Sequence, residues 1–216
     1  MVSLGLALVA SALTGLAVTD LKAAQSEAAK IRAEYQLDGL QERAGLTVVT
    51  DPKAVRLRWS LPTLSGSAEV LAEAEGAKLG LTGTVSLDTA TLTKLGVSDA
   101  RDLHRRLQTL AADRAVGLAL ENADASPVWR ACARSVVSIY GSAKAAPKMA
   151  YAAPTPGAVI ARSGEVWRIR VTSGGWTDDR TVRFTGDPLH PAAVVERRLY
   201  RGNEMGDRCA ALFAVG

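Results

Sequence analysis

The first nineteen residues, Met1 to Thr19, carry no charged side chain, and a highly charged stretch with helical spacing follows from Asp20 to Arg43. Nineteen helical residues reach roughly 28 Å, close to the ~30 Å hydrocarbon thickness of a bilayer. The sequence therefore predicts one long helix, with a transmembrane part at residues 1–19 and an amphipathic continuation at residues 20–46. The remaining residues, 47–216, are enough for one globular domain with a moderate core.

An apolar N-terminal segment can have three roles. It can be a cleaved signal peptide, a plain membrane anchor, or the spine of an assembling subunit, meaning a helix through which subunits pack together. A signal peptide has a basic start and a small-residue cleavage site, whereas here no Lys or Arg precedes Lys22 and Ala17-Val18-Thr19 is a weak site. The segment is also rich in Gly, Ala, Ser and Thr, which let membrane helices pack closely. These features favour a retained helix and leave anchor and spine both open.

The amphipathic part of this helix has a face that recurs at three-to-four-residue spacing: Ala24, Ala28, Ile31 and Tyr35. We interpret this face as the assembly surface of the helix. Ala44 is predicted to extend it, and the helix is predicted to end near Arg43, with Gly45 as the residue just beyond its end.

The charge of the chain is only mildly basic, with 26 Lys and Arg against 22 Asp and Glu. Val55 to Trp59 and Val166 to Thr172 interleave aromatic and basic residues, as proteins that bind single-stranded nucleic acids do. Strand alternation explains the pattern better, with Trp facing the core and Arg facing solvent. We expect no nucleic-acid partner.

Cys132 and Cys209 are the only cysteines, which excludes C-x-x-C arrangements. In an oxidising compartment they are expected to form a disulfide, and closing a loop of this length stabilises by about 4–5 kcal/mol in the entropy model. Two buried free thiols are the alternative.

Common hydrolase and nucleotide-binding motifs are absent, and neither His104 nor His190 has a nucleophile beside it in sequence. The chain is therefore predicted not to be an enzyme. A Ca²⁺ site is considered for these acidic residues: Asp178, Asp179, Asp187, Glu204 and Asp207. They lack the spacing of a calcium loop, so solvated turns are favoured and no cofactor or metal is expected.

The rest of the chain predicts an α+β fold. Residues 84–125 form a helical insert, and alternation predicts three adjacent antiparallel strands at 166–172, 181–185 and 193–200. Strands are also predicted at 55–59 and 135–140, whereas residues 68–76 fit strand or helix. The expected core is Trp59, Ile139, Trp167, Ile169, Val182 and Phe184, with Trp129 assigned to either core or interface.

Several segments occur in a characteristic order: a strand with Trp59, Leu87 to Ala90, a helical insert, Ser135 to Gly141, an Ala-Pro-rich connector, Gly164 to Ile169, and Val182 to Pro188. This order resembles the general secretion pathway protein K family, the minor pseudopilins of bacterial type II secretion. The resemblance covers nearly the whole chain, and the two closing segments are its most specific part.

The resemblance implies a long pilin-like helix, membrane-embedded in its first half and packed on a small antiparallel sheet, with a reduced helical insert. It also implies a single-pass inner-membrane protein with a periplasmic globular domain at the pseudopilus tip. There it would help to start assembly and export across the outer membrane. Implied partners are other minor pseudopilins, the inner-membrane secretion platform and secreted cargo. The alternative is a membrane-anchored periplasmic enzyme or binding protein unrelated to secretion.

The chain departs from the family pattern at several points. Family members commonly carry Leu-Asn-Thr-Ala where this chain has Asp88. The leader-peptidase junction falls at Gly5-Leu6, without a preceding basic residue, and a cut there leaves roughly 21 Å of uncharged helix. Either the natural start lies upstream of Met1, or the leader is not processed. Most pilin-like subunits have Glu at the fifth mature position, which this family typically lacks and which Ala10 occupies here.

Overall fold

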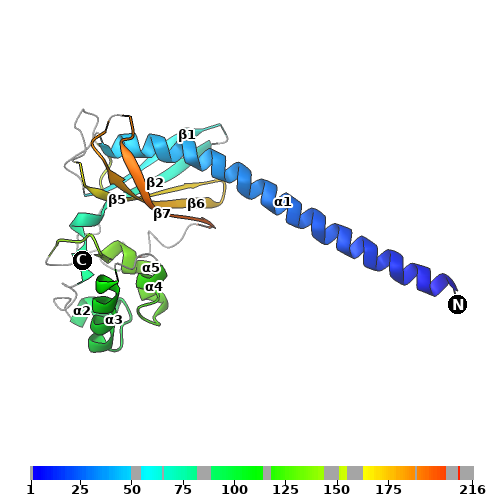
Figure 1. Ribbon diagram of the computed structural model, residues 1–216, viewed down its shortest axis with the longest axis horizontal. Coiled ribbons are helices and arrows are strands. Elements are labelled where there is room, and N and C mark those ends of the chain that lie inside the picture. The colour runs from blue at the N-terminus through cyan, green and yellow to red at the C-terminus, as the bar shows by residue number, and fades with distance from the viewer. Residues whose placement is uncertain are drawn as a thin grey trace.

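The computed structural model shows an α+β head carried on one end of a long helix (Figure 1). It describes residues 2–49, 55–64, 66–81, 89–113, 118–143, 151–154, 163–187, 189–202 and 209, with only the backbone for residues 2–14, 49, 111 and 118. The predictions for Glu204 and Asp207, and for the side chains of Gly5, Leu6 and Ala10, lie outside the described residues.

Helix α1 runs without a break from Val2 to Val49. Its C-terminal half lies over the sheet and its N-terminal half projects away from the head (Figure 1). The prediction that the helix ends near Arg43, with Gly45 just beyond its end, is wrong. Leu37, Ala44 and Val48 are all buried against the sheet. This packing outweighs the cost of about 1 kcal/mol that each helical glycine carries relative to alanine.

Ala44 was predicted to share a face with Tyr35, and it does not. Nine residues separate them, about 2.5 turns of helix, so the two side chains lie on opposite sides. Ala44 is buried between α1 and the sheet, whereas Tyr35 is exposed. The face containing Ala24 to Tyr35 therefore points away from the head.

Within the residues that the structure describes, no helix combines the length and the apolar character needed to cross a membrane.

The main sheet has five strands in the order β1-β2-β5-β6-β7, and every neighbouring pair is antiparallel. The strands are β1 (Arg56–Thr63), β2 (Gly66–Ala74), β5 (Val166–Ser173), β6 (Trp176–Phe184) and β7 (Ala192–Arg201). The three predicted C-terminal strands are confirmed as β5 to β7, and the ambiguous segment at 68–76 belongs largely to β2. Gly174 and Gly175, both with positive φ, form the two-residue turn that joins β5 to β6.

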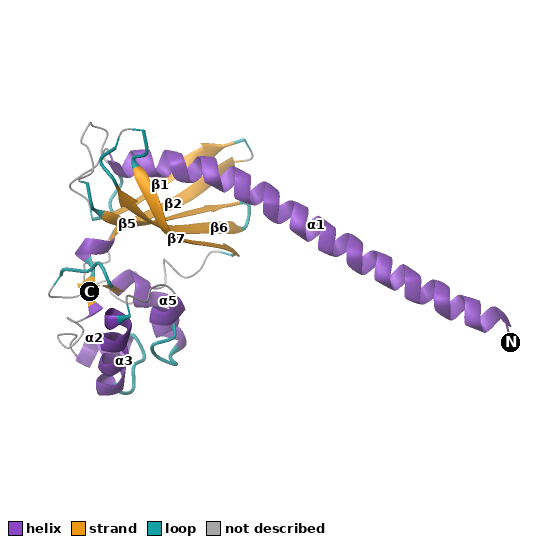
Figure 2. Cartoon of the chain, viewed as in Figure 1, coloured by secondary structure: helices purple, strands orange, loops and turns teal. Residues whose placement is uncertain are grey.

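Between β2 and β5 in the sequence lies a helical part that packs below the sheet, opposite α1 (Figure 2). Its elements are η1 (Glu75–Ala77), β3 (Leu79–Gly80), α2 (Thr89–Lys94), α3 (Ala100–Ala112), α4 (Leu118–Glu121), α5 (Pro127–Val136) and β4 (Val137–Ser138). Strands β3 and β4 form a short parallel pair. This helical part extends past the predicted limit near residue 125.

The strand predicted at residues 135–140 is wrong for its first residues. Ser135 and Val136 end α5, and only Val137 and Ser138 are paired as a strand. Helix α5 begins at a strong start signal, because the Ser126 hydroxyl accepts hydrogen bonds from the Val128 and Trp129 amides and Pro127 occupies the first turn.

The head contains two separate apolar cores. The first lies between α1 and the sheet, and the predicted core residues Trp167, Ile169, Val182 and Phe184 are confirmed there, with Trp59 partly buried at its border. The second lies within the helical part. Trp129 is fully buried at this second core, its indole Nε1 donates to the Leu120 carbonyl at 2.9 Å, and Ile139 packs partly buried against the core.

Candidate functional site

The two faces of the sheet differ in chemistry: the face toward α1 is mainly apolar, with Asp178 and Arg180 of β6 as charged members, and the face toward the helical part is mainly charged. Val70, Ile169 and Val171 alternate toward α1 and form the first core. On each strand, the residues that alternate with the core residues face the helical part. Glu73, Arg168 and Asp179 on this side are buried although they are charged. Strand alternation places every second residue on one face, so a mainly apolar face and a mainly ionic face follow from the sequences of β2 and β5.

Helix α1 is fixed to the sheet by polar contacts as well as by burial. The buried Gln41 donates from Nε2 to the carbonyls of Ile169, at 3.1 Å, and Asp178, at 2.8 Å. Asp38 pairs with Arg180, and with Arg197 at 3.0 Å. These directional contacts set the rotation of the helix on the sheet, which apolar packing alone specifies less tightly.

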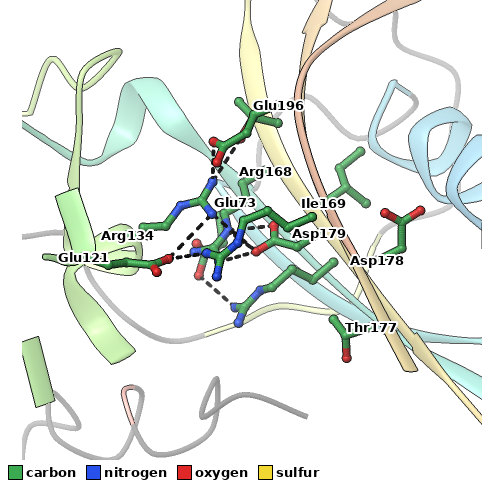
Figure 3. A network of polar contacts seen from close by, with 12 residues as sticks. Glu73, Glu121, Arg134, Arg168, Ile169, Thr177, Asp178, Asp179 and Glu196 are labelled. Atoms are coloured by element: carbon green, nitrogen blue, oxygen red, sulfur yellow. Dashed lines mark hydrogen bonds and ion pairs between the residues drawn. The ribbon is translucent and has the colours of Figure 1, made fainter. Parts of the chain in front are cut away.

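The centre of the ionic face is the pair Arg168 and Asp179 on neighbouring strands. Arg168 Nε donates to Oδ1 of Asp179 at 2.9 Å and its Nη2 donates to Oδ2, which is the two-bond fork geometry typical of strong arginine pairs. Asp179 also lies 3.7 Å from Nη1 of Arg134, which comes from α5 (Figure 3). Both partners of the central pair are buried.

Glu73 forms the second centre of the network. Its Oε1 pairs with Nη1 of Arg56 at 2.8 Å, and its Oε2 pairs with Nζ of Lys78 at 2.9 Å. The Tyr151 hydroxyl donates to Oε1 at 2.6 Å, and Nη2 of Arg170 lies 3.6 Å from the same oxygen. One buried carboxylate is thus surrounded by three cations and a phenol.

The network continues from the sheet into the helical part. Nη2 of Arg134 donates to Glu196 of β7 at 2.8 Å, and Arg198 of β7 pairs with Glu121 of α4. Figure 3 shows Arg134 directed between Glu196, Glu121 and the central pair. The helical part is therefore joined to the sheet by charged contacts that bridge two separate apolar cores.

These contacts displace the pKa values of the buried groups. Burial alone would raise the pKa of Asp179, but the Arg168 guanidinium beside it holds that pKa well below its usual range. Burial also opposes ionisation of Glu73, yet Lys78 and Arg56 keep its pKa low as well. Burial and the nearby Glu73 carboxylate raise the pKa of Tyr151, so its hydroxyl stays protonated.

The expectation that the strand arginines face solvent is wrong for three of them. Arg56, Arg168 and Arg170 are buried, because the helical part covers the face toward which they point. Arg58 is the exposed member and pairs with Glu69 across β1 and β2. The interleaved Trp and Arg residues on β5 therefore separate an apolar core from an ionic layer.

The residues predicted for assembly lie on the side of α1 that faces away from the head. Ala24, Ala28, Ile31 and Tyr35 are all exposed. Gly5 and Leu6 fall within the helical backbone of α1. Among the described elements of the head, none covers the predicted assembly face.

The structure joins Cys132 of α5 to Cys209 by a disulfide, with 5.4 Å between their Cα atoms. Both cysteines belong to the second core. The bond links the C-terminal segment to the helical part across 77 positions of sequence.

Of the acidic residues considered for a Ca²⁺ site, the three that the structure describes, Asp178, Asp179 and Asp187, do not converge on one point. Asp178 and Asp179 are consecutive on β6 and point to opposite faces of the sheet, as Figure 3 shows. Asp187 lies in an exposed turn, with its Oδ2 3.4 Å from Nδ1 of His190. His104 lies on α3. Among the described residues, no group of three or more His, Cys, Asp or Glu side chains is arranged to hold a metal ion.

The fold and its ionic layer define a class of molecule: an α+β head whose sheet carries a long projecting helix on one face and a charged, disulfide-linked helical part on the other. No family model, no curated protein and no solved structure matches this chain.

Proposed function

We propose that this protein is a minor pseudopilin of a type II secretion system, anchored in the inner membrane by residues 1–19, with its head in the periplasm. Helix α1 carries this proposal. Its C-terminal half is fixed to the sheet by Gln41 and Asp38, whereas residues 15–32 are exposed along their whole length. A helix that extends so far from its head is suited to packing against other subunits.

The mechanism follows from the chemistry of α1. The uncharged segment from Met1 to Thr19 is stored in the membrane and then packs laterally against the helices of neighbouring subunits. Leaving the bilayer is tolerable because apolar surface exchanges lipid contacts for protein contacts, and its small residues allow close approach. The same helix therefore acts as anchor and as assembly spine.

We place the subunit at the tip of the pseudopilus, where it helps to start assembly together with other minor pseudopilins. A cut at Gly5-Leu6 would put Ala10 at the fifth mature position, where most pilin-like subunits have Glu. A tip subunit needs no carboxylate there, because no subunit above it offers an N-terminal amine. Replacing Ala10→Glu should then reduce secretion, and an unchanged secretion level would remove the support for this placement.

The proposed role involves no catalysis, so it is tested through the helix. In cells that lack the gene, the full chain should restore secretion and a chain without residues 1–22 should not. A matched control carries a leucine-rich segment of equal length in place of residues 1–19, which anchors the head but lacks the small residues. The proposal expects this control to fail too.

The second candidate, a membrane-anchored enzyme or binding protein, predicts a different result. Its head would work with either anchor and would keep its activity when residues 1–22 are removed. Co-purification of the full chain with other minor pseudopilins gives the direct test. If it binds none of them, the pseudopilin proposal is refuted.

A further inference from the structure

Strand β7 forms one edge of the main sheet, and none of its residues is buried (Figure 2). The opposite edge, β1, is paired further: the Arg58 amide donates to the Ala152 carbonyl at 2.9 Å, and the Ala152 amide donates to the Arg56 carbonyl at 3.0 Å. Among the described residues, no backbone pairs with the outer side of β7. An unpaired strand edge is a template for a further strand.

The hydrogen bonds at the two ends of β7 show which of its backbone groups point outward. The Gly202 amide donates to the Gly175 carbonyl at 2.9 Å, and the Thr185 amide donates to the Pro191 carbonyl at 3.0 Å, so Gly202 and Pro191 face β6. In an antiparallel ladder, successive residues alternate between bonding to one neighbouring strand and pointing away from it. The register of β6 and β7 shifts once, so the alternation is counted from each end. The outward residues are Ala192, Val194, Arg197, Leu199 and Arg201.

An apolar groove lies between α1 and the outward residues of β7. Val194 is paired with Val182 of the first core, and directly opposite residues of antiparallel strands point to the same face, so Val194 faces the α1 side of the sheet. The groove beside it has a volume of about 470 Å³. Its apolar members Leu46, Leu189 and Val194 are 59%, 83% and 54% exposed. The apolar face of the sheet therefore continues from the first core to the free edge.

The far end of β7 carries a cation that the head leaves available. Glu196, Arg197 and Arg198 each pair with a charged residue elsewhere in the head. Arg201 is exposed, its guanidinium lies 5.0 Å from the centre of the Trp176 ring, and the described part of the chain holds no acidic partner for it. A carboxylate is therefore the group that this end of the strand is suited to bind.

We infer that β7 is a docking site for an extended segment of another protein, which adds to the sheet as a further antiparallel strand. Its backbone bonds to the outward groups of β7, its apolar side chains enter the groove beside Val194, and a carboxylate pairs with Arg201. Because the pairing is antiparallel, the carboxylate precedes the apolar residues in the segment. This inference does not depend on the proposed function.

A second copy of this chain fits the edge less well. Two β7 strands paired about a twofold axis at their centre place Glu196 opposite Glu196 or Arg197 opposite Arg197, and like charges directly opposite each other are destabilising. Charge complementarity at Arg201 also calls for an acidic partner strand, whereas the charged residues of β7 are three arginines and one glutamate.

The test selects binders from a phage-displayed library of random ten-residue peptides, the length of β7, with the full chain in lipid nanodiscs as bait. Val194→Pro removes one outward N–H at an edge position, where proline is tolerated, and Val194→Ile is its matched control because it keeps both the N–H and the apolar side chain. Arg201→Glu reverses the charge at the strand end, and Arg101→Glu makes the same change on the exposed surface of α3. Unchanged thermal unfolding verifies that each variant folds.

The expected peptides alternate apolar and polar residues after an Asp or Glu. Their binding should weaken about tenfold in Val194→Pro, because an intermolecular hydrogen bond is lost, and stay within about twofold in Val194→Ile. Arg201→Glu should weaken binding, Arg101→Glu should not, and a peptide with Lys in place of its acidic residue should bind Arg201→Glu more tightly than it binds the unchanged chain.

Hydrogen exchange identifies the mode of binding. A bound peptide should slow exchange of the outward amides of Arg197, Leu199 and Arg201. The inference is overturned if no peptide is enriched, if the selected peptides bind Val194→Pro as tightly as Val194→Ile, or if the protected amides lie on another element. Protection of β7 that appears without peptide as the protein concentration rises would assign the edge to a second copy and would also overturn it. None of these measurements involves secretion, so their failure leaves the proposed function untouched.

Discussion

Removing the carboxylate of Asp179 tests the ionic layer between the sheet and the helical part most directly. In Asp179→Ala the guanidinium of Arg168 stays buried and loses the two oxygens to which its Nε donates at 2.9 and 3.1 Å. Breaking one side of a buried pair costs about 3–5 kcal/mol, because the remaining charge is left without compensation. For a protein of this size, 1 kcal/mol corresponds to a melting-temperature change of about 2–4 °C, so the expected decrease is about 6–20 °C.

The assay is thermal unfolding of the full-length protein in detergent, followed by tryptophan fluorescence. Asp102→Ala is the matched control, because Asp102 pairs with Arg105 and Arg106 on the exposed side of α3 and such surface pairs contribute about 1 kcal/mol or less. The double variant Arg168→Met/Asp179→Leu removes both charges and should recover most of the loss. If Asp179→Ala melts within a degree or two of Asp102→Ala, the pair is not buried and the reasoning fails.

Three further predictions concern the same framework. Replacing Cys132 and Cys209 by Ser should lower the free energy of unfolding by about 4–5 kcal/mol, and peptide mapping without reductant should recover the two cysteines as one linked species; separate free thiols would contradict the structure. Glu73 and Asp179 have folded pKa values below their unfolded values, so the stability that they contribute is complete above about pH 4 and is lost as the pH falls through the lower, folded pKa; a urea midpoint that stays constant from pH 5 to pH 2 would oppose this. Gln41→Leu removes two buried hydrogen bonds and should cost about 1–3 kcal/mol in chemical unfolding, and a neutral result would show that Gln41 does not help to hold the helix on the sheet.

The strands of the sheet could be predicted from sequence because their pattern has a period of two. In β5, Trp167, Ile169 and Val171 alternate with Arg168 and Arg170, and this pattern alone gives the strand and its two faces. It does not tell what covers each face. Charged residues are most often exposed, so the arginines were assigned to solvent, whereas the helical part buries them against Asp179 and Glu73. That outcome is a property of the tertiary structure and has no local signal.

The error at residues 135 and 136 had a local signal that the prediction missed. The segment 135–140 is rich in β-branched residues, which favours a strand. Trp129, Cys132, Ala133 and Val136, however, recur at the spacing of one helix face, and all four are buried. The Ser126-Pro127 start signal precedes them. Counting the period from that start signal would have extended the helix to its observed end.

For the candidate site, the sequence predicted the exposed face of α1 but not the acidic residues beside it that pair with the sheet. The spacing of Ala24 to Tyr35 is visible in the sequence, whereas Glu34 and Asp38 matter because Arg180 and Arg197, well over a hundred residues later, bind them. Long-range ion pairs of this kind join segments whose separation carries no sequence signal.

The rigid attachment of α1 has a mechanical consequence for the proposed assembly. Gln41 and Asp38 fix both the rotation and the position of the helix on β5, β6 and β7. On the opposite face of the same strands, Arg134 and Arg198 connect to the helical part. A neighbour that turns the projecting half of α1 must therefore turn the sheet and the helical part with it. Contacts formed along the projecting half of α1 would thereby set the direction in which the helical part faces in the proposed assembly.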